Sequence, residues 1–301
     1  MAVHEQRDLF EGVRLSHPDK VMFGEQGLTK ADLAAHYERV GTRMMPFVEK
    51  RLLSLVRCPE GLEGPRFFQK HAGRGFPDEI GRMEIVENDG DEAEYLHVDG
   101  LAGIMAAVQI ATLEFHIWGS RIDRLEQPDR LVFDLDPDEG LGFSEVRDAA
   151  FDLRDRLATM GLKTLPLLTG GKGVHVVAPL ERRAEWPEVK AFARDFANML
   201  SRDEPERYVA NMSKAKRKGR IFVDYLRNER GSTAIAPYST RARAGAPVAT
   251  PVSWEELRKI EASAAFHLGD MQARMKAGDP WAEMPGWRQS VTKEMMAAVA
   301  G

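Results

Sequence analysis

Three aspartates of this chain stand in apolar segments, where a carboxylate is costly to bury. Asp134 and Asp136 lie at the end of the apolar run 131–136. Alternation along a strand puts both on one face, roughly 6.5–7 Å apart. Asp224 interrupts a second apolar run, 221–226. Neighbouring carboxylates repel each other and lose hydration, and a hard cation such as Mg²⁺ or Mn²⁺ offsets both costs. Three of them suit a two-metal phosphoryl-transfer centre, provided that Asp224 lies within about 10 Å of the pair. A turn or helix cap for the pair and a salt bridge to an arginine for Asp224 are the alternatives.

A glycine-rich turn between two predicted strands could bind phosphate. The segment Thr169-Gly170-Gly171-Lys172-Gly173 combines a hydroxyl, an ammonium group and unshielded backbone N–H groups, and His175 begins the next strand. It is not a Walker A loop, because Pro166 and Gly173 replace the required Gly and Ser or Thr. It is not a dinucleotide-binding fingerprint, because no helix is predicted to follow. A plain hairpin is the alternative for the turn, and a satisfied core histidine is the alternative for both His175 and His116.

Basic residues are concentrated in one stretch of an otherwise acidic chain. Ten Lys and Arg residues fall between positions 207 and 243, against two acids, so this stretch carries +8 and the remainder −13. A local basic surface on an acidic protein indicates a polyanionic partner bound at one place. Taken alone, the run 214–220 favours a solvated basic loop.

Length and composition exclude several classes of protein. The chain has 301 residues, 43% of them hydrophobic, and a net charge of −5, which excludes global disorder and allows a sizeable core. No run of 18 apolar residues occurs, the first twelve residues lack the apolar core of a secretory signal, and Cys58 is the single cysteine. We therefore expect a soluble, cytoplasmic protein with no membrane association.

Periodicity predicts alternating helices and strands along the whole chain. Helices are expected over 29–44 (with a Thr29/Asp32 capping box), over 101–111, from an N-cap at Ser144 to Gly161 and from Pro187 onward, and a last helix is expected after a Ser253/Glu256 capping box. Strands are expected over 52–57, 67–70, 95–99, 113–118, 131–136, 164–168, 174–178, 220–226 and 234–237. The polar, Gly-rich segment 73–94 predicts a surface loop. The hairpin-like pair within 164–178 predicts a mixed sheet with antiparallel members.

Several rare segments occur together in one order. They are LSHPDKVMFG, RFFQKH, VDGLAGIMAAVQIATLEFHIWGSR, VFDLDPDEG, TGGKGVHVVAPL, GRIFVDYLRNERGSTAIAPYSTRARAGAPVATPVSWEEL and DPWAEM. Together they closely resemble the polymerase domain of bacterial DNA ligase D, a member of the archaeo-eukaryotic primase superfamily that serves non-homologous end joining. The resemblance implies an α/β (α+β), primase-like fold with mixed, largely antiparallel sheets flanked by helices around a central active-site cleft. We expect an N-terminal part over about 1–125, a catalytic part over about 126–260 and a C-terminal helical tail over about 261–301.

The resemblance also implies a role for each matching residue. The catalytic, metal-binding residues would be Asp134, Asp136 and Asp224. The nucleotide would be bound by Phe68, which stacks on the base, and by His116, Thr169, Lys172, His175, Arg227 and Arg241. Thr169 stands where the family usually has Ser, and it keeps the hydroxyl. Lys20 and Lys30 would bind the DNA 5′-phosphate beyond a gap, with solvated surface lysines as the alternative. Phe67 points away from Phe68, so one of the two is expected to pack inside.

The implied activity is addition of nucleotides to a 3′-OH at DNA ends or gaps, with two Mn²⁺ (or Mg²⁺) ions and a preference for ribonucleotides and Mn²⁺. The implied partners are NTP or dNTP, double-stranded DNA with ends, gaps or overhangs and a 5′-phosphate, ligase and nuclease domains of a longer protein, and the Ku end-binding protein. The implied location is the nucleoid. Two other functions stay open: a non-catalytic module that bridges DNA ends, which needs no aligned acids, and a two-metal nuclease, which needs no base-stacking aromatic.

Overall fold

The computed structural model describes residues 9–73 and 75–300. The chain divides into two compact units that are interleaved along the sequence. The first comprises Met1–Trp118, Ile235–Ala249 and Phe266–Asp279, and the second comprises Gly119–Ala234, Thr250–Ala265 and Pro280–Gly301. Each unit has its own sheet and its own buried apolar core.

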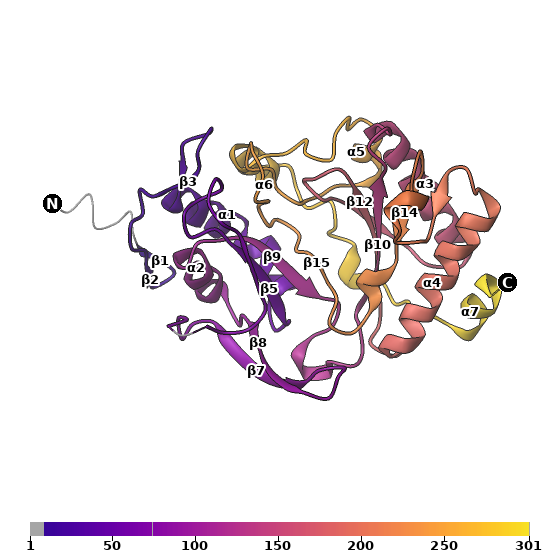
Figure 1. Ribbon diagram of the computed structural model, residues 1–301, viewed down its shortest axis with the longest axis horizontal. Helices are drawn as coiled ribbons and strands as arrows, with labels where there is room; N and C mark the ends of the chain where they lie inside the picture. Colours follow the sequence, from indigo (N-terminus) through magenta and orange to yellow (C-terminus); the bar gives the residue numbers. More distant parts are fainter. Residues whose placement is uncertain (1–8, 74, 301) are drawn as a thin grey trace. The chain divides into compact units, whose positions relative to one another are not determined.

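The first unit is built on a sheet in the order β15-β9-β5-β8-β7, with β6 also paired to β5. Its strands are β5 (Leu53–Arg57), β6 (Phe67–Gln69), β7 (Gly81–Val86), β8 (Glu92–His97), β9 (Thr112–Trp118) and β15 (Thr233–Ile235). Two small hairpins precede it, β1 (Leu9–Phe10) with β2 (Val13–Arg14) and β3 (Val21–Phe23) with β4 (Leu28–Thr29). Its helices are α1 (Lys30–Val48), α2 (Leu101–Gln109), the 3₁₀ turn η4 (Leu268–Asp270) and α6 (Met271–Lys276). Helix α1 packs against α2 and α6 (Figure 1).

Helix α1 begins as the sequence predicts. The Thr29 hydroxyl accepts from the Asp32 N–H at 3.2 Å, and the Asp32 carboxylate accepts from the Thr29 N–H at 2.8 Å, which completes the capping box. Its apolar positions, among them Leu33, Tyr37 and Val40, are fully buried. The periodic apolar face therefore fixes how the helix packs.

The second unit is built on a six-stranded sheet in the order β13-β14-β10-β12-β11-β16. Its strands are β10 (Arg130–Pro137), β11 (Leu165–Leu168), β12 (Val174–Pro179), β13 (Tyr208–Val209), β14 (Ile221–Asp224) and β16 (Thr250–Pro251). All neighbours are antiparallel except β13 and β14, which confirms the predicted mixed sheet. Its helices are α3 (Phe143–Thr159), α4 (Trp186–Asp203), α5 (Trp254–Leu257) and α7 (Lys293–Val299), with 3₁₀ turns η1 (Ile122–Arg124), η2 (Lys214–Lys216), η3 (Leu226–Asn228) and η5 (Met284–Gly286).

Strand β10 separates an apolar face from a polar one. Leu131, Phe133 and Leu135 are fully buried, and the Phe133 ring lies 5.0 Å from the ring of Phe196 in α4. Helices α3 and α4 both contact β10 (Figure 1). The side chains at alternate positions, which include both aspartates of the strand, therefore point away from this packing.

Three expectations about local structure are wrong. Segment 73–94 is not all loop, because β7 pairs antiparallel with β8 from Gly81↔His97 to Val86↔Glu92. Charged residues at alternate positions of this edge hairpin give the segment the polar composition that is typical of a loop. Helix α3 begins at Phe143 with Gly142 as its N-cap, and the Ser144 hydroxyl donates to Glu145 instead of capping. The Ser253/Glu256 capping box forms, but it starts only the short helix α5, and two more helices follow.

Among the described residues, no helix combines the length and the apolar character that crossing a membrane requires.

Candidate metal and nucleotide-binding sites

Pairing of β10 with β14 brings the three predicted metal-binding aspartates together. Asp134 lies directly opposite Asp224, and Asp136 is two residues further along the same face of β10. One carboxylate oxygen from each of the three lies within 4.8 Å of the others. Ligands of one octahedral Mg²⁺ or Mn²⁺ lie roughly 3 Å apart when adjacent and roughly 4.2 Å apart when opposite, so side-chain rotations that draw the three oxygens closer would let them bind a common ion. An all-oxygen donor set suits these hard cations.

The Arg227 guanidinium forms ion pairs with two of the three acids, as a bound cation would. Its Nη2 lies 3.2 Å from Asp134 Oδ2 and 3.2 Å from Asp224 Oδ2, so the predicted salt bridge of Asp224 is also present. Asn228, which sequence reasoning missed, holds this turn in place. Its buried side-chain amide bonds both backbone groups of Val132 in β10, each at 2.7 Å. Turn η3 is thereby fastened to the strand that carries two of the acids.

The three carboxylates have different proton affinities. Burial and the charges of Asp134 and Asp224 raise the pKa of Asp136 to about 6. Burial also acts to raise the pKa of Asp134, but His175 and Arg227 outweigh it and hold this pKa at about 2. Burial raises the pKa of Asp224, in part against the charge of Arg227. The site therefore has more negative charge than Arg227 alone neutralises, as a cation-binding site requires.

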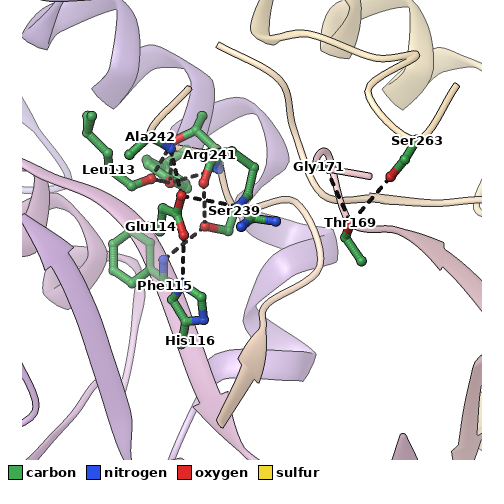
Figure 2. Close-up of polar contacts among 12 residues, drawn as sticks. Leu113, Glu114, Phe115, His116, Thr169, Gly171, Ser239, Arg241, Ala242 and Ser263 are labelled. Atoms are coloured by element: carbon green, nitrogen blue, oxygen red, sulfur yellow. Dashed lines mark hydrogen bonds and ion pairs between the residues drawn. The ribbon is translucent and has the colours of Figure 1, made fainter. Parts of the chain in front are cut away.

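The glycine turn closes the hairpin of β11 and β12 beside the acids. A Cβ at Gly173 would lie 2.5 Å from the carbonyl oxygen of Leu135 in β10, so only glycine allows this approach. Thr169 is buried, and its hydroxyl donates to the Gly173 carbonyl at 2.9 Å. The same hydroxyl accepts from the Gly171 N–H at 3.3 Å, a contact drawn in Figure 2. Ser263 donates to the same carbonyl at 2.5 Å. The Thr169 hydroxyl thus shapes the glycine turn. Lys172 is exposed at the tip of this turn.

His175 is a buried neighbour of the acidic cluster. It lies opposite Asp134 in the β10–β12 pairing, and its Nε2 is 3.4 Å from Asp134 Oδ2. Only 3% of the residue is exposed. The histidine contacts a candidate metal ligand directly, and its role as a triphosphate contact stays a prediction.

In the first unit, Glu114 joins two of the predicted nucleotide-binding residues. Figure 2 shows its carboxylate between His116 on the same strand and Arg241 on the segment after β15. The His116 Nε2 lies 2.7 Å from Oε2, and the Arg241 Nε lies 3.1 Å from Oε1. The resemblance did not point to this acid, although an acid inside the apolar strand 113–118 is a visible signal.

The two adjacent phenylalanines of β6 are both on the surface. Phe68 is 64% exposed and Phe67 is 51% exposed, so the expectation that one of them packs inside is wrong. The short strand β6 pairs with β5 beside the main path of the sheet, and both phenylalanines stay exposed there. Phe68 has its ring edge-to-face with His116 at 5.9 Å between centroids. It is therefore placed to stack on a planar ligand.

The two predicted 5′-phosphate lysines line one pocket of about 550 Å³ in the first unit. Lys30 is buried, and its ammonium donates to the carbonyls of Ser16 at 2.8 Å and Gln109 at 3.1 Å. Burial and then the charge of Lys20 lower its pKa. Arg57, which sequence reasoning missed, lines the same pocket. The alternative of a solvated surface lysine is wrong for Lys30, because the residue is buried and its ammonium is bonded to two backbone carbonyls.

The amino-acid sequence is similar to that of known LigD proteins. A sequence model described as the LigD primase-polymerase domain matches residues 29–281. The chain is 39% identical over 287 residues to the multifunctional non-homologous end joining protein LigD of Pseudomonas aeruginosa, covering 94% of this chain and 34% of that protein. It is 28% identical over 259 residues to the bifunctional non-homologous end joining protein LigD of Bacillus subtilis, covering 86% of this chain and 41% of that protein. The chain thus spans between about a third and about two fifths of the length of these relatives.

A solved structure shares the fold as well. The polymerase domain from Mycobacterium tuberculosis Ligase D in complex with DNA superposes with a TM-score of 0.83 at 30% identity, over 91% of this chain and 98% of that one. The primase-like mixed fold that the sequence predicts is therefore confirmed. From the family match over most of its length, together with these relatives, this chain belongs to the LigD primase-polymerase domain family.

Proposed function

We propose that this chain is a metal-dependent nucleotidyltransferase that adds nucleotides to the 3′-OH of a DNA primer at ends or gaps during non-homologous end joining. Family membership supports a nucleotidyltransferase, and the DNA bound to the similar polymerase domain supports DNA as the partner. The observation that carries the proposal is the convergence of Asp134, Asp136 and Asp224 within 4.8 Å. A DNA-bridging module would have no use for that cluster.

Each site then has a role in one reaction. Two divalent ions held by the three aspartates would supply activation of the primer 3′-OH and stabilisation of the departing pyrophosphate, with Mn²⁺ and ribonucleotides preferred. Lys172, His175 and the backbone N–H groups of the glycine turn would bind the triphosphate, with the Thr169 hydroxyl holding the turn. Arg227 would turn from the acids to the phosphates once cations are bound.

The first unit would supply the contacts that do not involve metal. Phe68 would stack on the base, which is worth about 1–3 kcal/mol and does not select sequence. His116 and Arg241 would contact the same nucleotide. The pocket of Lys20 and Lys30 would bind a 5′-phosphate and so direct the chain to gaps. Ligase and nuclease domains and the Ku protein would act with it in the cell.

A primer-extension assay tests the proposal. A labelled primer on a gapped template with a 5′-phosphate is incubated with Mn²⁺ and NTPs, and we expect it to lengthen. Asp136→Ala should abolish extension but leave DNA binding nearly unchanged, while the matched control Glu139→Gln, an exposed acid just beyond β10, should extend normally. An unchanged primer would indicate a bridging module, and a shortened one a nuclease. Extension by Asp136→Ala at the wild-type rate would overturn the metal assignment.

A further inference from the structure

Glu114 is a buried carboxylate whose two oxygens are both engaged. Only 6% of the residue is exposed, and it lies in strand β9 between fully buried Leu113 and Phe115. Oε2 accepts from His116 Nε2 at 2.7 Å, and Oε1 accepts from the Ala242 N–H at 2.7 Å and pairs with Arg241 Nε at 3.1 Å. Burial acts to raise its pKa, but His116 and Arg241 outweigh it and hold the pKa at about 2. The group is therefore an anion at any physiological pH.

The segment that carries Arg241 is fastened to the same strand on both sides of Glu114. The Phe115 N–H donates to Ser239 Oγ at 2.9 Å, and the Thr240 hydroxyl donates to the Leu113 carbonyl. These bonds hold Ser239 and Thr240 to β9, and the Ala242 N–H is held by Glu114 itself (Figure 2). A neutral side-chain acceptor could also take the Ala242 N–H, so attachment of the segment does not require a charge, and burying one is costly unless its charge serves a purpose.

The negative charge of Glu114 orients two side-chain groups, the His116 imidazole and the Arg241 guanidinium. His116 and Glu114 are two residues apart, so they share one face of the strand, and His116 is in turn in edge contact with the exposed Phe68 ring. A carboxylate at Nε2 keeps the imidazole proton on Nε2, so in the neutral ring Nδ1 carries the lone pair. The same carboxylate fixes the Nε edge of the Arg241 guanidinium.

We propose that Glu114 is a positioning residue of the nucleotide-binding surface on the first unit, which sets the tautomer of His116 and the direction of the Arg241 guanidinium. The inference rests on the proposed function, since it assumes that these residues meet a nucleotide. It assigns no contact between Glu114 and the nucleotide. It requires the negative charge of Glu114, because a neutral amide of the same shape presents a donor to one of its partners.

The test uses Glu114→Gln with Glu94→Gln, an exposed acid of strand β8 in the same sheet, as the matched control. Side-chain ¹⁵N NMR, with His116 assigned by its loss in His116→Gln, should show the Nε2–H form in the wild type and a shift toward Nδ1–H in Glu114→Gln. The Kd for ATP with Mn²⁺ and without DNA should rise about tenfold in Glu114→Gln, which corresponds to about 1.4 kcal/mol, and should not change in Glu94→Gln.

Each outcome decides the inference. A wild-type His116 with its proton on Nδ1 overturns it and needs no variant, so a Glu114→Gln chain that fails to fold does not remove the test. A tautomer shift with unchanged ATP affinity also overturns it. A wild type that binds ATP but never extends a primer defeats the proposed function and leaves the positioning role to the NMR and affinity results. A tautomer shift with weakened ATP binding supports the inference.

Discussion

Replacement of Asp136 by Asn should make the metal-free protein more stable while it abolishes activity. The free carboxyl has a pKa of 3.8, and burial with the charges of Asp134 and Asp224 raises it to about 6 in the folded state. For an acid whose folded-state pKa is raised, stability falls as the pH increases from 3.8 to 6 and stays low above that. Two pKa units correspond to about 3 kcal/mol at neutral pH. Because the side chain retains partial access to water, about 1–3 kcal/mol is the expected gain from Asn.

Thermal unfolding at pH 7.5 measures this gain. In EDTA, Asp136→Asn should melt higher than the wild type by roughly 2–12 °C, at about 2–4 °C per kcal/mol for a chain of this size. Mn²⁺ should raise the melting temperature of the wild type, because a ligand that binds only the folded state stabilises it, and should raise that of Asp136→Asn much less. Glu139→Gln should match the wild type under both conditions. A melting temperature of Asp136→Asn in EDTA that is equal to or below that of the wild type would refute the argument that the acids repel each other.

Three further predictions concern the first unit. Burial lowers the pKa of His36 to about 4, so this group destabilises the fold as the pH falls from 6.5 to 4, by about 3 kcal/mol in total. The difference in urea unfolding midpoint between wild type and His36→Gln should therefore change across this pH range. A constant difference would contradict the prediction. Phe68→Ala should weaken nucleotide binding by about 1–3 kcal/mol and Phe67→Ala by less, as measured by titration with ATP, and equal losses would remove the base-stacking role. Replacing Lys20 and Lys30 by Gln should abolish the preference for a 5′-phosphorylated gap in a binding assay, and a wild type that binds both gaps equally would show that the premise is wrong.

The parts of the site that follow strand alternation could be predicted from the sequence. In the run 131–136 the apolar residues and the aspartates alternate, so the two faces of β10 follow from the pattern alone. The position of Asp224 opposite Asp134 did not follow from local pattern, because strand pairing is a long-range choice. Only the requirement that a third carboxylate join the pair led to it.

The residues that sequence reasoning missed act through contacts that have no local signature. The Asn228 side-chain amide bonds the backbone N–H and carbonyl of Val132, as the backbone of a neighbouring strand would. No rule of residue spacing predicts this contact. Arg57 reaches the lysine pocket from β5, and its Nε donates to the carbonyl of Ile110 at 2.8 Å. The hairpin of β7 and β8 pairs residues close in sequence, but its exposed edge carries charges where a buried strand carries apolar residues, so its pattern indicates a loop. For Asn228 and Arg57 the deciding partner lies far away in the sequence.

An acid within an apolar strand is better interpreted together with the residue two positions away, since the two share a face. For Asp136 that residue is Asp134, and burial together with the like charges of Asp134 and Asp224 raises the pKa of Asp136 to about 6. For Glu114 it is His116, and the pKa of Glu114 falls to about 2. The first pair lacks a sufficient internal cation and so needs one from solution, whereas the second is satisfied within the protein. The same rule that predicts a metal site in β10 therefore predicts none in β9, where the acid serves to orient its neighbours.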